Sequence, residues 1–200
     1  APGTGGAGVG DVNLTPRRLV LGGRQRAGEV VVFNRGNARA VYRLELEDLA
    51  MTPQGALETL DKVDPVLRAR HRSAKEMLRY SPRRIELAPG ASQVVRVLAR
   101  SAPDEAPGER RSHLVVTGTP TEGAGLDVAE AVAPGSRELR VRIMPVFGIS
   151  IPIIARTGDL PVQVTVVDPR VTRTDGRATL TAGLRRTGDR SVYGDVEVLF

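Results

Sequence analysis

The sequence contains no cysteine and no tryptophan, and only three Phe and three Tyr among 200 residues. Without cysteine, disulfides, zinc–thiolate sites and cysteine nucleophiles are excluded. With so few aromatic side chains, a hydrophobic core has to be built from Val, Leu, Ile and Ala. Nonspecific single-strand binders usually stack bases on aromatic rings. We therefore expect no nucleic-acid partner, although the net charge is +6.

Long apolar runs are absent as well. The longest candidate, 143–154, is interrupted by Pro145, Gly148 and Pro152 and is shorter than the roughly 18 residues of a membrane-spanning helix. We expect no membrane span. The Gly-rich residues 1–10 predict a flexible leader, and the Ala-Pro-Gly start is compatible with cleavage behind a secretory signal.

Catalytic chemistry has little support in the sequence. The two histidines, His71 and His113, have no partners at metal-ligand spacing. Neither a nucleophile elbow nor a phosphate loop occurs in the chain. The acidic cluster of Glu45, Glu47 and Asp48 is interpreted as a charged strand edge. We therefore expect a non-enzymatic protein with no catalytic residue, no metal and no cofactor.

Strand signals dominate what is present. Short segments with alternating apolar and polar residues, or with clustered β-branched residues, are separated by turn-forming Gly, Pro and Asn. The segments are 12–21, 29–34, 40–47, 84–87, 93–98, 112–117, 162–166, 178–182 and 192–200. The uneven spacing of Val41, Leu44 and Leu46 suggests a β-bulge. Many short strands without intervening helices predict an all-β, immunoglobulin-like sandwich.

Residues 50–80 interrupt this pattern. Asp64 followed by Pro65 has the form of a helix cap and a first helical residue. The apolar residues that follow are spaced as one face of a helix: Val66, Leu67, Ala74, Met77 and Leu78. We expect a short helix in an insertion packed on the sandwich. The basic residues of this segment leave contact with a membrane or a nucleic acid as the alternative.

The most informative stretch is 139–153, where every second residue is apolar. Arg140 and Arg142 occupy the alternate positions at its start. A strand this long exceeds the usual five or six residues, so part of it is available to a partner. Residues 156–159 are interpreted as a linker. The expected organisation is a leader at 1–10, an immunoglobulin-like domain at 11–156 with an insertion near 50–80, and the start of a second such domain at 157–200.

Several segments, taken together and in order over about 11–160, resemble the periplasmic pilus (fimbrial) assembly chaperones. The strongest is 80–97, with a Ser-Pro step, a strand, a Pro-Gly turn and a Gln-Val-Val-Arg strand. The other segments that resemble the family are 14–21, 32–34, 42–44, 108–112 and 148–156. As a set they identify the chain as a divergent member of this family.

The resemblance implies a fold, a mechanism and partners. The family has two immunoglobulin-like domains, and its G strand is donated to an incomplete pilin sandwich. Leu139, Val141 and Ile143 correspond to the donor strand. The implied partners are secreted pilin-like subunits and an outer-membrane usher, and the implied compartment is the periplasm. A homodimer that caps its own G strands is a further candidate assembly.

The resemblance also implies charged site residues, with departures from the family pattern. Arg18 best matches the basic residue that anchors the guest's C-terminal carboxylate, with Arg17 as the alternative by register. The family's second anchor, a lysine, is missing from 148–152. Three alternatives follow from the missing lysine. Arg18 acts alone, another arginine such as Arg142 takes the place of the lysine, or the guest is held differently. Arg156 matches an interdomain residue, but Arg111 occupies the place of its usual acidic partner, which puts that ion pair in doubt.

The alternative to a chaperone is another extracytoplasmic immunoglobulin-like protein, with a structural or adhesive role. A pilin should carry an alternating apolar extension at its N-terminus, and residues 1–10 are Gly-rich instead. A chaperone should carry that alternation in an internal strand, as at 139–153. The position of the alternation therefore favours the chaperone.

Overall fold

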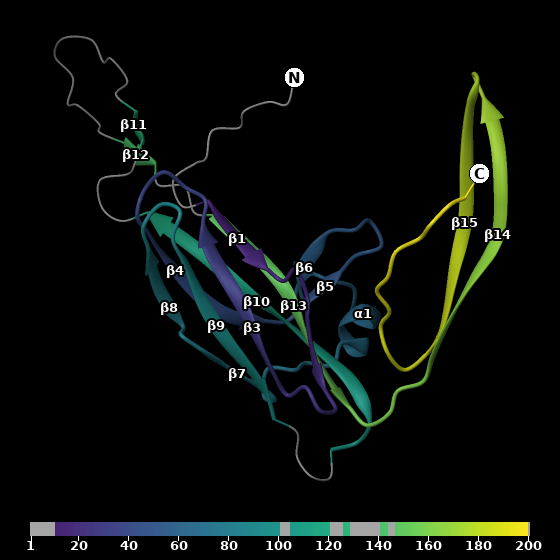
Figure 1. The fold of residues 1–200 in the computed structure, drawn as a ribbon, viewed down its shortest axis with the longest axis horizontal. Coiled ribbons are helices and arrows are strands. Elements are labelled where there is room, and N and C mark those ends of the chain that lie inside the picture. The colour runs from purple at the N-terminus through teal and green to yellow at the C-terminus, as the bar shows by residue number, and fades with distance from the viewer. Residues whose placement is uncertain (1–10, 101–104, 121–125, 129–140, 144–146, 200) are drawn as a thin grey trace. The chain divides into compact units, whose positions relative to one another are not determined.

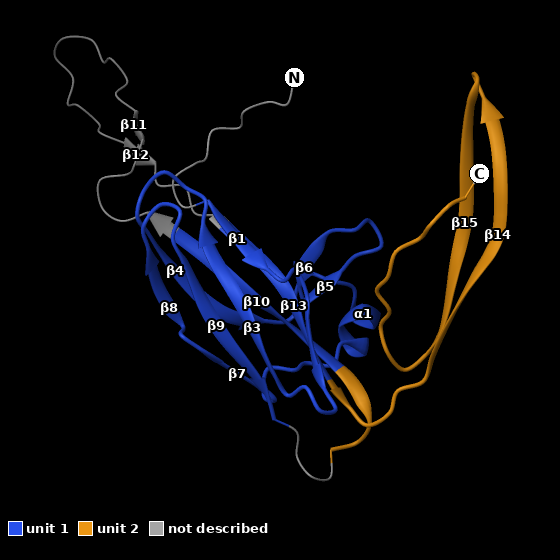
Figure 2. Ribbon diagram, in the orientation of Figure 1, with its two compact units in different colours: residues 1–100, 110–155 blue, residues 101–109, 156–200 orange. Residues whose placement is uncertain are grey.

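The computed structural model describes residues 11–100, 105–120, 126–128, 141–143 and 147–199, and these are mostly strands (Figure 1). The predicted leader at 1–10 lies outside the described residues. The chain divides into two compact units (Figure 2). Unit 1 contains residues 1–100 and 110–155, and unit 2 contains residues 101–109 and 156–200.

Unit 1 is built around two sheets that form a sandwich. The first sheet has four strands in the order β1 (Val12–Thr15), β3 (Ala27–Asn34), β9 (Ser92–Ala99) and β7 (Leu78–Ser81). The second has five strands in the order β2 (Leu19–Gly22), β13 (Phe147–Thr157), β10 (Gly108–Pro120), β4 (Ala40–Glu47) and β8 (Arg84–Leu87). The predicted all-β class and immunoglobulin-like sandwich are confirmed.

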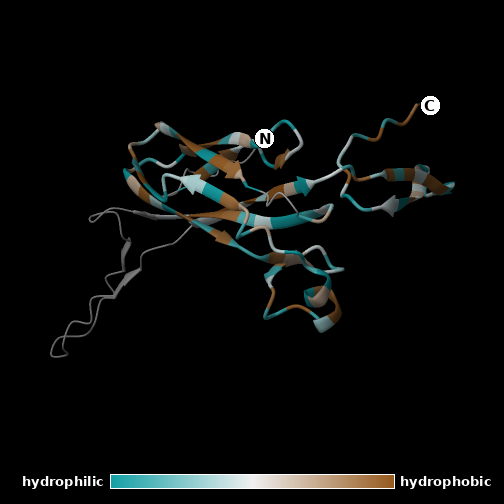
Figure 3. Ribbon diagram, turned by 90° about the horizontal axis from the view of Figure 1, so that it is seen from below, coloured by the Kyte–Doolittle hydropathy of each residue, from teal (hydrophilic) through white to brown (hydrophobic). Residues whose placement is uncertain are grey.

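The core lies between these sheets and is made mainly of aliphatic side chains. Hydrophobic and hydrophilic residues alternate along the strands (Figure 3), as expected when one face of each sheet is buried. The largest fully buried side chains are Leu14, Leu21, Val30, Val32, Tyr42, Leu44, Leu78, Val95, Val97, Leu114, Ile153 and Ile154. Each such side chain stabilises the fold by about 1.5–3 kcal/mol before ordering costs are counted.

The chain passes from one sheet to the other at two prolines. Residues 12–21, expected as a single segment, form β1 and β2, which belong to different sheets, with Pro16 between them. Pro82 lies in the same way between β7 and β8. Proline has no backbone N–H to donate to a ladder, so a strand that reaches it can leave its sheet there.

Strand β4 is regular, and the expected bulge is wrong. Residues 40–47 pair with 113–120 of β10 in an unbroken register. Ala40, Tyr42 and Leu44 point inward and are almost fully buried, while Val41 lies on the other face. The apparent irregularity arose because Tyr42 was not counted as a core residue. Burial, together with the nearby charge of Asp11, raises the pKa of Tyr42 to about 12.

The insertion contains β5 (Leu49–Met51), β6 (Leu57–Thr59) and the helix α1 (Pro65–Arg70). The Asp64 side chain accepts hydrogen bonds from the N–H groups of Val66 and Leu67 at 2.7 and 3.2 Å. The predicted cap and short helix are therefore confirmed. The predicted apolar helical face is wrong, because the helix ends at Arg70 and buries no residue. Ala74, Met77 and Leu78 instead join the sandwich core.

Unit 2 contains one two-stranded antiparallel sheet, formed by β14 (Val162–Thr174) and β15 (Arg177–Gly188). Its register shifts between Val167 and Arg170. The strand expected at 192–200 is wrong over the described residues, because 192–199 form no regular element. Apolar alternation specifies which face of a strand is buried once it is paired, but it does not itself provide the pairing.

Candidate functional site

The predicted donor segment is only partly within the described residues. Val141 and Ile143 lie in β12 (Val141–Ile143), which pairs with β11 (Leu126–Val128) as a two-stranded antiparallel sheet. The register sets Val141 opposite Val128 and Ile143 opposite Leu126. Leu139 and residues 144–146 lie outside the described residues. The expected long strand is therefore described as two strands, β12 and β13.

The second half of the alternating stretch serves the chain's own core. Ile151 and Ile153 in β13 are 2% and 0% exposed, and Ile149 packs against the same core. Because these residues are already buried within unit 1, they are not available to a partner. Of the apolar residues at 139–153, the residues that precede β13 remain the candidates for strand donation.

The predicted carboxylate anchors, Arg17 and Arg18, lie in the bend between β1 and β2. Arg17 is exposed and Arg18 is half-buried. Strand β2 begins at Leu19, immediately after Arg18, and is the neighbour of β13 in the five-stranded sheet. The fold therefore sets the anchor candidates beside the strand that continues from the predicted donor segment.

Arg156, predicted as an interdomain residue, has an acidic partner that the sequence analysis missed. Its Nε donates to Glu109 Oε2 at 2.9 Å, and its Nη2 donates to the Ser191 carbonyl at 2.9 Å. The Ser191 N–H donates to the same carboxylate oxygen at 3.0 Å. The acidic partner of Arg156 therefore lies in β10, two positions before Arg111. All three bonded residues belong to unit 2.

The electrostatics of Glu109 follow from these bonds. Burial alone would raise the pKa of its carboxyl group, but the hydrogen bonds from Ser191 and Arg156 and the charge of Arg156 outweigh that effect. The pKa therefore lies below its ordinary value. The carboxylate stays ionised and holds residues 156 and 191 together.

Replacing Glu109 by Ala should loosen this part of unit 2. The change leaves the partly buried Arg156 guanidinium and the Ser191 N–H without their shared acceptor, at a cost of about 1–2 kcal/mol. Amide exchange at Ser191, measured by NMR, should become about tenfold faster. The exposed acid Glu197, changed to Ala, is the matched control. Unchanged exchange at Ser191 would contradict the role of Glu109.

A second polar cluster ties the insertion to β10 of unit 1. Asp48 Oδ1 accepts hydrogen bonds from the hydroxyls of Ser112 at 2.6 Å and Ser73 at 3.1 Å. His71 Nε2 lies 3.5 Å from Oδ1, and Lys75 Nζ lies 3.7 Å from Oδ2. The interpretation of Asp48 as an exposed strand edge is wrong, since its side chain is 15% exposed.

The same cluster determines how two of its groups titrate. Burial raises the pKa of Asp48, but the bonds from Ser112 and Ser73 and the charges of Lys75 and His71 bring it below its ordinary value. Burial, followed by the charges of Arg111 and His71, lowers the pKa of His113 to about 4. Asp48 is therefore ionised and His113 neutral near pH 7. The hydrogen bonds that Asp48 accepts from the two serine hydroxyls, together with its ion pairs, are structural contacts between the insertion and the sandwich.

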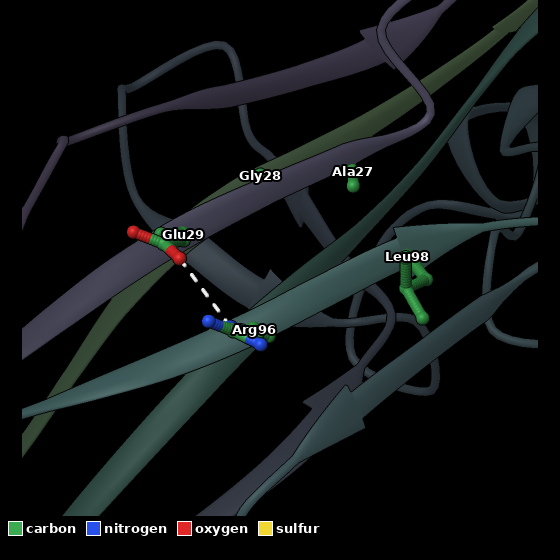
Figure 4. Close-up of a pocket in the computed structure, with 5 residues that line it drawn as sticks. All are labelled: Ala27, Gly28, Glu29, Arg96 and Leu98. Atoms are coloured by element: carbon green, nitrogen blue, oxygen red, sulfur yellow. Dashed lines mark ion pairs between the residues drawn. The ribbon is translucent and has the colours of Figure 1, made fainter.

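The outer face of the four-stranded sheet carries a hollow of about 540 Å³ that none of the predicted site residues lines. Figure 4 shows its lining residues, Ala27, Gly28, Glu29, Arg96 and Leu98. Glu29 and Arg96 are directly opposite each other on β3 and β9 and form an exposed ion pair at 3.4 Å. Their charges are mutually compensated.

Two features of the described part of the chain concern metals and membranes. Its His, Asp and Glu side chains form no group of three that could hold a metal ion. No helix in that part combines the length and the apolar character needed to cross a membrane.

Comparison with known proteins gives matches among solved structures. No family model and no curated protein matches the sequence. The Pseudomonas aeruginosa CupB2 chaperone is 12% identical with a TM-score of 0.46, over 90% of this chain and 88% of that one. The E. coli chaperone DraB is 11% identical with a TM-score of 0.46, over 94% and 88%.

A human structure is also among the matches. The ASH/PapD-like domain of human CEP192 is 10% identical with a TM-score of 0.43, over 76% of this chain and 87% of that one. Further matches include the Salmonella enterica SafA pilin in complex with the SafB chaperone, at 9% identity with a TM-score of 0.45 over 90% of this chain and 84% of that one. Several of the solved structures similar to this chain are thus chaperones.

Proposed function

We propose that this protein is a periplasmic chaperone that binds secreted pilin-like subunits by donating a strand. The observation that carries the proposal is the apolar alternation of Leu139, Val141 and Ile143 directly before β13 of an immunoglobulin-like sandwich. The later alternating residues, Ile151 and Ile153, belong to the core of the chain itself.

Strand donation needs two kinds of contact. The backbone of the donated strand pairs with the edge of the incomplete guest sheet, and alternate side chains fill pockets in the guest. Each apolar side chain buried in this way would stabilise the complex by about 1.5–3 kcal/mol before ordering costs. Three residues at every second position match this requirement, with Arg140 and Arg142 at the intervening positions.

The proposed anchor for the guest's C-terminal carboxylate is Arg18, with Arg17 as the alternative. A guanidinium can bond both oxygens of a carboxylate at once. Arg18 directly precedes β2, which neighbours β13, the strand that follows the proposed donor segment. Arg142 remains the candidate second cation. Arg156 is bonded to Glu109 within unit 2 and is given no guest-binding role.

Arg18→Ala should weaken capture of the guest without unfolding the chaperone. Loss of a hydrogen-bonded charge pair corresponds to about 1.5–3 kcal/mol, or about 10- to 100-fold in affinity. The binding constant for a purified guest, measured by calorimetry, is the readout, and Arg24→Ala is the control at an exposed turn position. If Arg18→Ala and Arg17→Ala both bind the guest with wild-type affinity, neither arginine is the carboxylate anchor.

The experiment that tests the function is co-purification from the periplasm of the native host. Tagged protein is isolated, and bound proteins are identified by mass spectrometry. Small secreted β-rich subunits, released by a synthetic peptide of the guest's complementing strand, support the chaperone. An outer-membrane usher would be recovered only when a guest is also present. Recovery of the protein alone, or as a homodimer that Val141→Asp leaves intact, favours an extracytoplasmic structural or adhesive protein instead.

A further inference from the structure

Two arginines lie side by side on the outer face of the five-stranded sheet. Arg43 of β4 is directly opposite Arg84 of β8 in the antiparallel register. Their neighbours Tyr42 and Ile85 are buried in the core, so both arginines point outward, and both are exposed. Figure 1 shows β4 and β8 as adjacent strands at this edge of the sheet.

The ladder sets these arginines at the closest cross-strand spacing. The Leu44 N–H donates to the Arg83 carbonyl at 2.9 Å, so the adjacent pair is a hydrogen-bonded one. Hydrogen-bonded and non-hydrogen-bonded pairs alternate along antiparallel strands. Arg43 and Arg84 therefore occupy a non-hydrogen-bonded position, where Cα atoms lie about 4.5 Å apart and side chains are closest.

Like charges placed directly opposite each other destabilise a sheet unless something neutralises them. Within the described ranges neither arginine forms an ion pair, and the nearby Glu86 is engaged by Arg39 at 3.3 Å. Glu45, two residues along β4, forms no ion pair with either arginine. The other sheet differs, because there Glu29 and Arg96 supply opposite charges at a directly paired position.

A hydroxyl group extends the row of donors. Thr117 of β10 is directly opposite Arg43 on its other side and is partly exposed. Arg84, Arg43 and Thr117 thus form a line across three adjacent strands, with two guanidinium groups and one hydroxyl. A phosphate dianion matches both charges and has oxygens for all three groups, whereas a carboxylate matches one charge only.

We propose that Arg43, Arg84 and Thr117 form a phosphate-binding site on the outer face of the five-stranded sheet. The ligand is a single phosphate group that can carry two charges, either free or carried by a lipid headgroup as a phosphomonoester. The site is independent of strand donation, because none of its residues belongs to β12 or to the bend at Arg17 and Arg18.

The test is thermal unfolding in inorganic phosphate and in chloride at matched ionic strength. Phosphate should raise the Tm of the wild-type protein above its value in chloride. Arg43→Gln should raise the Tm in chloride, because it removes the repulsion, yet weaken phosphate binding at least about tenfold. Arg24→Gln, at an exposed turn, is the control and should keep the wild-type phosphate response.

A second arm separates the two sources of phosphate. Wild-type protein and the Arg43→Gln/Arg84→Gln variant are sedimented with phosphatidylcholine vesicles that contain phosphatidic acid, whose phosphomonoester can carry two charges, or with phosphatidylcholine vesicles alone. Binding to phosphatidic acid that is lost in the variant identifies a lipid headgroup, and a response to inorganic phosphate alone identifies the free ion. Retention of either response in the variant, or no response in the wild type, overturns the site.

Discussion

Val141→Asp is expected to abolish capture of pilin-like subunits in the co-purification experiment. The change would place a carboxylate in an apolar groove of the guest, where it has no partner. Removing an unpaired charge from water costs at least several kcal/mol, so affinity should fall by more than about 100-fold. This loss should exceed that of Arg18→Ala, because the anchor contributes one contact whereas the donated strand forms the interface.

The matched control is Val66→Asp. Val66 is 66% exposed and lies in the first turn of α1, where an acidic side chain is favourable. The same chemical change there should leave both folding and capture intact. Far-UV circular dichroism should show the β spectrum of the wild type for both variants. Equal recovery of the guest with Val141→Asp and wild-type protein would sink the donor-strand assignment, while leaving the sandwich fold untouched.

Much of the sandwich could be predicted because its core follows local rules. Alternation at 29–34 and 93–98 corresponds to β3 and β9, and Asp64 with Pro65 marks the start of α1. These signals depend only on neighbouring residues. The split of 12–21 at Pro16 was harder to predict, because the sheet that a strand joins depends on distant partners.

The polar clusters illustrate what local patterns leave out. Asp48 reads as one more acid after a charged strand, yet Ser112, 64 positions away, donates a hydrogen bond to it. Glu109 reads as part of a charged turn, and its bonds to Arg156 and Ser191 span 47 and 82 positions. Nothing in the spacing of such residues identifies the pairing. An exposed acid on a loop and a partly buried acid in an ion pair can lie in the same local sequence. Burial alone separates them.

The free energy of unfolding is expected to fall by about 2 kcal/mol as the pH is lowered from 7 to 4. His113 is 6% exposed and its Nδ1 has no hydrogen-bond partner within the described structure. Burial and neighbouring cations lower its pKa from 6.5 to about 4. Between these values the unfolded chain binds a proton that the folded chain does not, so stability falls as the pH falls. The full shift corresponds to about 3 kcal/mol, which solvent screening reduces.

His113→Gln should remove most of this slope. Glutamine does not titrate, so unfolding of the variant is no longer coupled to binding of a proton at this position. Denaturant unfolding followed by circular dichroism, at fixed ionic strength and half-unit pH steps, measures both proteins.

Asp48 affects stability at lower pH than His113. The pKa of Asp48 in the folded state is depressed, so its contribution to the free energy of unfolding is present above pH 3.8 and is lost as the pH falls through the folded value. Asp48→Asn should therefore alter stability at pH 7 yet keep the slope between pH 6.5 and 4. The same slope in His113→Gln and wild-type protein would show that the buried imidazole is not its source.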